Sequence, residues 1–427
     1  MLASFLLPFF SCTKTQPAEV AEEQEQEQEQ EGEAPAPEYP FLAAEAPSSL
    51  PAEERGMVSD IQSFACSFLA RIAEDTQGSF VVSPTSLAYL LGMLSEGAAG
   101  QTREEIISAL GFDGKKQEGI GPFCRDLMVL TSSLAPSDAV IEVANGIWPR
   151  QDLSLSEPFR KALRNYYDAS FQEVDFSKPG EALARINGWA SDKTHGRIEK
   201  LMDVVDPSTP AIFANALYFK AEWKCPFSAK KTEETTFHLD DNRERKVQMM
   251  KLHHPVEMFQ FFESEDLSML TLPFGENGCS MSFLLPAQDK SLADLLAQLD
   301  GRKLSSVFAG RKWEHVDIWI PRMTVDSKKE LSGTLSKMGI RTLFEAPDLS
   351  PMWEKAGGGN SSVRILQSST LSLDEKGAEA ASATFSGSAV LPPEVPPVLK
   401  EFHADRPFVF LIQENKTGAL LFAGCYR

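Results

Sequence analysis

The sequence lacks the short motifs that mark the active sites of common enzyme classes. It contains no GxSxG, no HExxH, no phosphate-binding GxxxxGK(S/T) and no GxGxxG after a predicted strand. The glycine-rich run "AGGGNSS" at residues 356–362 has neither the lysine nor the flanking pattern of a phosphate loop, so we expect a surface loop there. Together these absences argue against an enzyme.

Histidine and cysteine are scarce, and neither forms a metal-ligand pattern. Only the adjacent pair His253 and His254 suggests a metal, and neighbouring residues in a strand point to opposite faces. The cysteines beyond the N-terminus form no CxxC pair and are expected to be buried free thiols: Cys66, Cys124, Cys225, Cys279 and Cys425. We therefore predict no catalytic residues, no metal site and no cofactor.

Basic residues are in deficit, since 41 Lys and Arg stand against 61 Asp and Glu, for a formal net charge of −20. More than half of this charge comes from residues 16–55, which contain twelve acidic residues and one arginine. This segment is too polar and repetitive to fold, so residues 13–56 are predicted to be a disordered, self-repelling tether. The remainder is mildly acidic, which argues against a nucleic acid partner.

No apolar run is long enough to cross a membrane as a helix. Residues 1–12, "MLASFLLPFFSC", are nevertheless apolar and place a small serine directly before Cys12. They resemble a bacterial lipoprotein signal, although no basic residue stands near Met1 and Phe9 occupies a position where leucine is usual. We expect an exported protein, extracellular or held at the cell surface as an outer-membrane lipoprotein through a lipidated Cys12. An ordinary secretory signal is the alternative.

The composition from residue 57 to residue 427 is that of a folded protein. Its N-terminal third has helical periodicity, and three helix starts are indicated by capping residues: Ser59 with Gln62, Ser83 with Pro84, and Thr102 with Glu105. Later segments, "VDIWIPR", "SMSFLLP", "PFVFLIQ" and "GALLFAG", are typical of strands, and the last two could form a hairpin. This order predicts an α+β fold with antiparallel or mixed sheets.

The segment "EKGAEAASATFSGSAVLPPEVPP", residues 375–397, carries neither charge nor proline from Ala380 to Leu391. Every second residue from Ala378 is small or β-branched, so that face could slide into a sheet over a packed core. The other face has one charge, Glu379, and Gly377 supplies backbone freedom at the pivot. On composition alone a flexible linker is the better interpretation, and a short helix is another.

Four longer segments carry a family resemblance. "SPTSLAYLLGMLSEGAAGQT", "INGWASDKTHGRIEKLM", "AIFANALYFKAEWKCPF" and "HADRPFVFLIQENKTGALLFAG" each resemble patterns of the serpins, a family of serine protease inhibitors, and they occur in the family's order. The resemblance covers about residues 57–427. It implies the serpin fold, an α+β fold with a mainly helical N-terminal region, large mixed β-sheets and an exposed reactive-centre loop.

The resemblance makes residues 375–397 this loop. Its hinge would be Glu375, Gly377, Ala378, Glu379, Ala380, Ala381, Ser382, Ala383 and Thr384, with Ala378 where inhibitory members commonly have threonine. Family spacing, fourteen residues on from Gly377, places the cleaved bond between Leu391 and Pro392. Because most serine proteases cut poorly before proline, Val390–Leu391 and Ala389–Val390 are alternatives. Each bond offers an aliphatic residue, so elastase-like or chymotrypsin-like targets are expected.

The resemblance also implies a mechanism. The inhibitor would act as a suicide substrate: a serine protease cuts the loop, remains bound as an acyl-enzyme, and is trapped when the loop enters the central sheet as a new strand. The implied partner is thus a protease in covalent complex, with cysteine proteases as a second class, and the inhibitor itself is expected to be a monomer. With its signal, the chain resembles a bacterial, exported member. The alternative is a non-inhibitory serpin, a binding protein or a simple protease substrate.

Overall fold

Helix α1 (Ala52–Asp75) is the first element in the part of the chain that the structure describes. This computed structural model describes residues 49–112, 119–134, 139–241, 243–254, 256–355, 363–378 and 399–427. The predicted signal with Cys12, most of the predicted tether and the glycine-rich run at 356–362 lie outside these ranges. Helix α1 begins at Ala52, before the predicted start of the folded domain at residue 57, which stays a prediction. Residues 52–56 are mostly exposed, and this first part of α1 connects Leu50 to Met57, both of which are buried.

The remaining helices lie in two groups along the chain. The first group comprises α2 (Pro84–Glu96), α3 (Gly100–Ala109), α4 (Ile120–Ser132), α5 (Glu157–Tyr167) and α6 (Pro179–Lys193). Two 3₁₀ turns lie further along the chain, η2 (Ala229–Lys231) and η3 (Ser350–Met352). The second group comprises α7 (Leu292–Gln298), α8 (Gly301–Ala309), α9 (Ser332–Lys337) and α10 (Thr342–Glu345). The N-terminal region is therefore mainly helical, as predicted.

One of the three predicted helix starts is confirmed. Ser83 caps α2 through a hydrogen bond from the backbone N–H of Ser86 to its hydroxyl, and Pro84 is the first helical residue. The capping box at Thr102 is wrong, because this residue lies inside α3, where its hydroxyl accepts from the Asp348 N–H at 2.9 Å. The capping box at Ser59 is also wrong, because α1 starts earlier. For Thr102 a distant segment, rather than the local helix end, decides where the polar side chain lies.

Three β-sheets complete the fold. The seven-stranded sheet has the order β1 (Phe80–Val82), β17 (Leu420–Tyr426), β16 (Phe408–Glu414), β9 (Cys279–Pro286), β8 (Leu267–Phe274), β7 (Phe259–Glu263), β10 (Lys312–Glu314). The four-stranded sheet has the order β15 (Lys400–His403), β11 (Val316–Pro321), β6 (Glu244–Leu252), β5 (Glu233–His238). The six-stranded sheet has the order β12 (Met323–Glu330), β13 (Arg364–Leu373), β14 (Gly377–Ala378), β4 (Ala211–Glu222), β2 (Val140–Pro149), β3 (Ala169–Phe171). The predicted α+β class, the four predicted strands and the predicted β16–β17 hairpin are confirmed.

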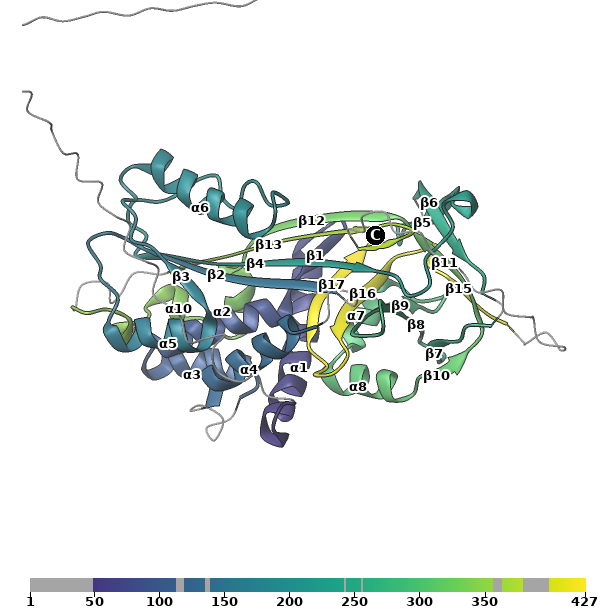
Figure 1. The fold of residues 1–427 in the computed structure, drawn as a ribbon, viewed down its shortest axis with the longest axis horizontal. Helices are drawn as coiled ribbons and strands as arrows, with labels where there is room; N and C mark the ends of the chain where they lie inside the picture. The colour runs from purple at the N-terminus through teal and green to yellow at the C-terminus, as the bar shows by residue number, and fades with distance from the viewer. Residues whose placement is uncertain are drawn as a thin grey trace, which may run out of the picture. The chain divides into compact units, whose positions relative to one another are not determined.

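The six-stranded sheet lies between helices on both faces (Figure 1). Successive residues of β4 point to opposite faces, so Phe213 packs into the core beneath α1, α2 and α4, while Ile212 and Ala214 pack under α6. The facing residues of α6 are small or aliphatic, including Ala182 and Ile186. The two central strands, β13 and β4, are therefore buried on both sides over most of their length.

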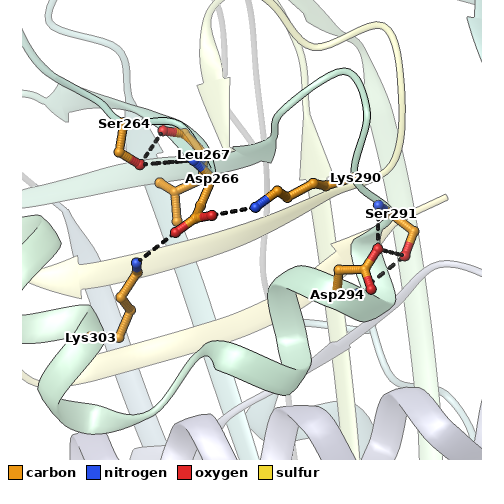
Figure 2. Close-up of polar contacts among 7 residues, drawn as sticks. All are labelled: Ser264, Asp266, Leu267, Lys290, Ser291, Asp294 and Lys303. Atoms are coloured by element: carbon orange, nitrogen blue, oxygen red, sulfur yellow. Dashed lines mark hydrogen bonds and ion pairs between the residues drawn. The ribbon is translucent and has the colours of Figure 1, made fainter.

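A charged network fastens the seven-stranded sheet to α7 and α8 (Figure 2). Asp266, in the turn between β7 and β8, accepts hydrogen bonds from Lys290 and from the Lys303 ammonium, the latter at 3.2 Å. These two hydrogen bonds lower the pKa of Asp266, and they keep its carboxylate charged. Beside them, Ser291 and Asp294 form the capping box that starts α7. The turn, the start of α7 and the start of α8 are thus joined through one carboxylate.

Cys66, Cys124 and Cys425 are buried free thiols, as predicted, Cys279 is also buried and forms no disulfide, and Cys225 is only half-buried. Within the described residues, no helix combines the length and the apolar character needed to cross a membrane.

Candidate functional site

The six-stranded sheet is forked at one end, between β13 and β4. Over residues 364–368 of β13 and 212–216 of β4 the two strands pair directly and in parallel. Beyond this they diverge, and the two-residue strand β14 lies between them, antiparallel to both. No described strand pairs with the facing edges of residues 369–372 and 217–220. We call the region where β13 and β4 diverge, on either side of β14, the fork.

The turn that leads from β13 to β14 is fastened to the loop after β4. The backbone N–H of Trp223 donates to the carbonyl oxygen of Lys376 at 2.7 Å, and its indole Nε1 donates to the carbonyl oxygen of Asp374 at 3.0 Å. The Phe227 N–H donates to the carbonyl oxygen of Glu375 at 2.8 Å. Because Trp223 is buried and stacks on an aromatic ring of β8, this fastening point is rigid.

The side chain of Glu375 adds a buried charged contact. Only 7% of the residue is exposed, and its carboxylate accepts hydrogen bonds from Arg322 Nη2 and from Thr232 Oγ1, both at 2.5 Å. Burial alone would raise the pKa of Glu375, but the hydrogen bonds from the guanidinium and the hydroxyl outweigh it and lower the pKa. The predicted first residue of the hinge is thus held as a carboxylate, between the start of β12 and the four-stranded sheet.

Gly377 occupies a position that no other residue fits. Its φ of +147° is in the region that favours glycine, and a Cβ atom there would lie 2.2 Å from the carbonyl oxygen of Ala221 and 2.7 Å from Cα of Glu222. The close approach follows from pairing with β4, where Gly377 is opposite Glu222. The glycine therefore allows the chain to enter between two strands that would otherwise exclude it.

Ala378 completes the described part of the predicted hinge. It is fully buried and lies opposite Leu373 in β13 and Ala221 in β4. The structure thus brings three predicted hinge residues, Glu375, Gly377 and Ala378, together at the fork. The other predicted hinge residues and the candidate bonds lie outside the described residues: Glu379, Ala380, Ala381, Ser382, Ala383, Thr384, Ala389, Val390, Leu391 and Pro392.

A row of amide side chains crosses the sheet below the fork, and the sequence did not suggest it. Asn145 in β2, Asn215 in β4 and Gln367 in β13 are directly opposite one another and almost fully buried. The Gln367 side chain exchanges two hydrogen bonds with the backbone of Ser83, at 2.8 and 3.0 Å. The only signal in the sequence is a polar residue in the middle of each apolar strand, such as the asparagine in "IFANALYF".

The histidine pair and the candidate metal ligands lie elsewhere. His253 Nδ1 is 2.5 Å from Asp317 Oδ1, whereas His254 Nδ1 accepts from the Glu257 N–H at 2.8 Å, so the two rings have separate partners. Within the described ranges no group of three or more His, Cys, Asp or Glu is arranged to hold a metal ion. The opening between β13 and β4 could accept an added strand, because no described strand pairs with their facing edges.

Comparison with known proteins agrees with this geometry. Residues 59–427 match the family model described as serpin (serine protease inhibitor). The chain is 31% identical to Serpin-ZXA of Oryza sativa subsp. japonica over 80% of this chain and 88% of that protein. It is 30% identical to alpha-1-antitrypsin 1-2 of Mus musculus over 86% of this chain and 88% of that protein. The native-state structure of the thermophilic serpin tengpin superimposes with a TM-score of 0.79 at 23% identity, covering 91% of this chain and 98% of that one.

The chain therefore belongs to the serpin family and has the serpin fold. Members of this family are typically inhibitors of serine proteases rather than enzymes, and they act by forming complexes with the proteases they inhibit. The family membership confirms the resemblance from which the hinge was predicted.

We expect Gly377→Ala to displace β14 from the fork. The added methyl group overlaps the backbone of β4 and should destabilise the fold by about 1–3 kcal/mol, the usual range for overpacking. Hydrogen exchange followed by mass spectrometry should show faster exchange at Trp223 and Phe227, whose N–H groups donate to the hinge. Gly188→Ala is the control, because a Cβ there meets nothing within 4 Å. Unchanged exchange in Gly377→Ala would contradict this account of the hinge.

The Glu375 contact should make the stability of the hinge depend on pH. Because the folded pKa is lowered, the contact stabilises the fold above the ordinary value of 4.5 and is lost as the pH falls through the folded pKa. Glu375→Gln should therefore cost about 1–2 kcal/mol of unfolding free energy at pH 7, and this difference should shrink at an acidic pH below 4.5. Denaturant unfolding at both pH values measures it, with the exposed Glu265→Gln as control. A deficit that persists at the lower pH would show that charge is not the cause.

Proposed function

We propose that this protein inhibits serine proteases as a suicide substrate whose cut loop enters the six-stranded sheet at the fork. The observation that carries the proposal is the position of Gly377 and Ala378, which already lie between β13 and β4 as the start of a strand. The facing edges of 369–372 and 217–220 continue the same opening. From Ala380 to Leu391 the sequence has no charge and no proline, and every second residue from Ala378 is small or β-branched, as a strand entering a packed sheet requires.

The fork also sets the register of the incoming strand. Extending the pairs of Ala378 with Leu373 and with Ala221 places Thr384 between Gln367 and Asn215. The same extension places Gly387 between Arg364 and Ile212, which are paired with each other now. The two edges therefore agree on a single register, and the new strand would replace the direct β13–β4 pairing over its whole length.

In the proposed mechanism the protease supplies all the catalytic groups. Its nucleophile attacks the carbonyl of the bait bond and forms an ester, and the amine of the following residue leaves. Insertion of about fourteen residues, each advancing about 3.3 Å, would move the attached protease by roughly 45 Å. Because a misplacement of about 1 Å can cost on the order of 100-fold in rate, the deformed protease would not hydrolyse the ester.

The bait bond determines the target class. Family spacing favours Leu391–Pro392, and Val390–Leu391 and Ala389–Val390 avoid the proline. In each case a small or medium aliphatic residue would enter the specificity pocket of the protease. We therefore propose elastase-like and chymotrypsin-like proteases as targets, with cysteine proteases as a second class to be tested.

We further propose that the inhibitor is exported and held at the cell surface through a lipidated Cys12. The acidic tether would then hold the serpin domain, which begins at α1, away from the membrane. Replacing Cys12 with serine should move the protein from the membrane fraction to the medium without changing inhibition. Equal membrane association of both proteins would contradict the anchor.

A denaturing gel tests the inhibitory mechanism. The protein is incubated with elastase-like, chymotrypsin-like and cysteine proteases, and a covalent complex should run as a band at the summed mass. Mass spectrometry of the released peptide locates the bond. Complete cleavage without such a band would instead support the rival function, a non-inhibitory serpin that is a binding protein or a simple protease substrate.

Thr384→Arg should convert the inhibitor into a substrate. The register places residue 384 on the buried face, opposite the fully buried amides of the sheet, so insertion would bury an unpaired charge. The expected result is loss of the covalent band and a gain of at least tenfold in complete turnover. Ala381→Arg is the matched control, since this position faces the half-exposed Thr370 and Tyr218. Full inhibition by Thr384→Arg would exclude insertion in this register.

A further inference from the structure

The segment that follows α6 crosses the six-stranded sheet on the face that carries this helix (Figure 1). We call this segment, residues 194–205, the strap. Its apolar side chains pack in one cluster with Trp148 of β2, Ala214 of β4 and Leu366 of β13. The last two of these residues are directly opposite each other. The strap therefore covers three neighbouring strands at the level where β13 and β4 pair directly.

Hydrogen bonds join the strap to α6. Asn187 Oδ1 accepts from the backbone N–H groups of Leu201 and Met202 at 2.8 and 3.0 Å, and Asn187 Nδ2 donates to the carbonyl oxygen of Met202 at 3.0 Å. At the beginning of the strap, the Thr194 hydroxyl donates to the carbonyl oxygen of Ala190 in α6 at 2.7 Å. We therefore expect the strap and α6 to move as one unit.

On one side the strap is fastened to β2 and β4. His195 Nε2 lies 2.8 Å from Glu142 Oε2 in β2. The His195 ring also packs against the ring of Tyr218 in β4, with the two centroids 4.6 Å apart. Glu142 and Tyr218 are directly opposite each other in the two strands. One histidine thus contacts both strands on this side of the sheet.

On the other side the strap is fastened to β12 and β13. Asp203 Oδ2 accepts from Lys328 Nζ of β12 at 2.8 Å, and the carbonyl oxygen of Val204 accepts from Arg364 Nη1 of β13 at 3.0 Å. Asp203 also forms an ion pair with Lys200 inside the strap. Hydrogen bonds from Lys200 and Lys328 lower the pKa of Asp203 to about 2, so its carboxylate is charged at neutral pH.

The boundary between β13 and β4 separates these two sets of contacts. Lys328 is opposite Ser368 in β13, and Ser368 is opposite Ala216 in β4, two residues from Tyr218. The contacts therefore lie at nearly the same level of the sheet. A new strand between β13 and β4 would move β12 away from β2 by one strand spacing, about 4.8 Å. Contacts of 2.8 Å on both sides would not survive this displacement together.

We propose that the strap resists widening of the sheet, and that the Asp203–Lys328 and His195–Glu142 pairs are its fastening points. Insertion would break the contacts on one side of the boundary, while α6 and the strap would stay with the strands on the other side. This inference rests on the proposed function. It adds that the rate of insertion, and with it the ratio of turnover to trapping, depends on exposed ion pairs outside the fork.

Lys328→Gln tests this resistance in the intact protein, without a protease. The substitution removes one fastening point and leaves the Asp203–Lys200 pair in place. Backbone hydrogen exchange at residues 212–216 and 364–368 should become about twofold to fivefold faster, which corresponds to the loss of one exposed ion pair. At a salt concentration of about 1 M the wild type should approach the rate of the variant, because salt screens the pair.

A matched substitution controls for the loss of a surface charge. Lys337→Gln breaks a similarly exposed ion pair, 2.7 Å long, between α9 and Asp75 at the end of α1, and it should leave exchange at the boundary unchanged. Unchanged exchange in Lys328→Gln would overturn the proposal. An equal increase at residues 281–284 of the seven-stranded sheet would also overturn it, because the substitution would then only lower the overall stability.

The ratio of turnover to trapping gives the functional measurement. With a protease that the wild type traps, this ratio should be about twofold to fivefold lower in Lys328→Gln, since faster insertion leaves less time for hydrolysis of the ester. Equal ratios would overturn the link between the strap and inhibition. If the wild type trapped no protease, the proposed function would fail, and the exchange experiment would still decide whether the strap resists widening.

Discussion

The structure depends on a pair of parallel strands that is only half formed. β13 and β4 are the two central strands of the six-stranded sheet, and both are buried on both faces over most of their length. If β13 and β4 paired along their whole length, the sheet would have an ordinary continuous interior. Instead Gly377 enters where no side chain fits, and β14 holds the strands apart at one end. Strand edges normally occur at the rim of a sheet, where proteins protect them from pairing with other strands. At the fork, two strand edges lie in the interior of the sheet instead.

The contacts around the fork explain how such an opening can persist. The turn before β14 is bound through three backbone carbonyls, and Glu375 adds a buried carboxylate held by Arg322 and Thr232. These groups fix the start of the loop relative to both neighbouring strands. A segment that entered from this end would have one register available, because both edges impose the same pairs. The fixed start of the loop is therefore compatible with insertion of the residues that follow it.

Much of the fold follows from local patterns in the sequence. The four predicted strands are short apolar runs between turn residues, and Ser83 with Pro84 starts a helix, because the information for these elements lies within a few residues. The hinge could be located from the sequence through its family resemblance. The fork itself could not be predicted, since it requires the register of β13 and β14 against β4, which lies far away in the chain.

The errors have a common physical origin. Thr102 and Ser59 are residue types that often cap helices, but both lie inside helices. Thr102 accepts a hydrogen bond from the distant Asp348, and α1 begins before Ser59, between the buried Leu50 and Met57. The amide row was missed for the same reason. A single asparagine in an apolar strand does not indicate a polar row until its neighbours across the sheet are known. Asn145, Asn215 and Gln367 come from three distant segments of the chain.

The position of the β16–β17 hairpin has a consequence for any chain cut between residues 378 and 399. The C-terminal piece would keep β15, β16 and β17, and β16 lies between β9 and β17 inside the seven-stranded sheet. Every residue of β16 and β17 is buried. The smaller fragment would therefore stay in place without a covalent link, and the molecule would continue as a two-chain protein.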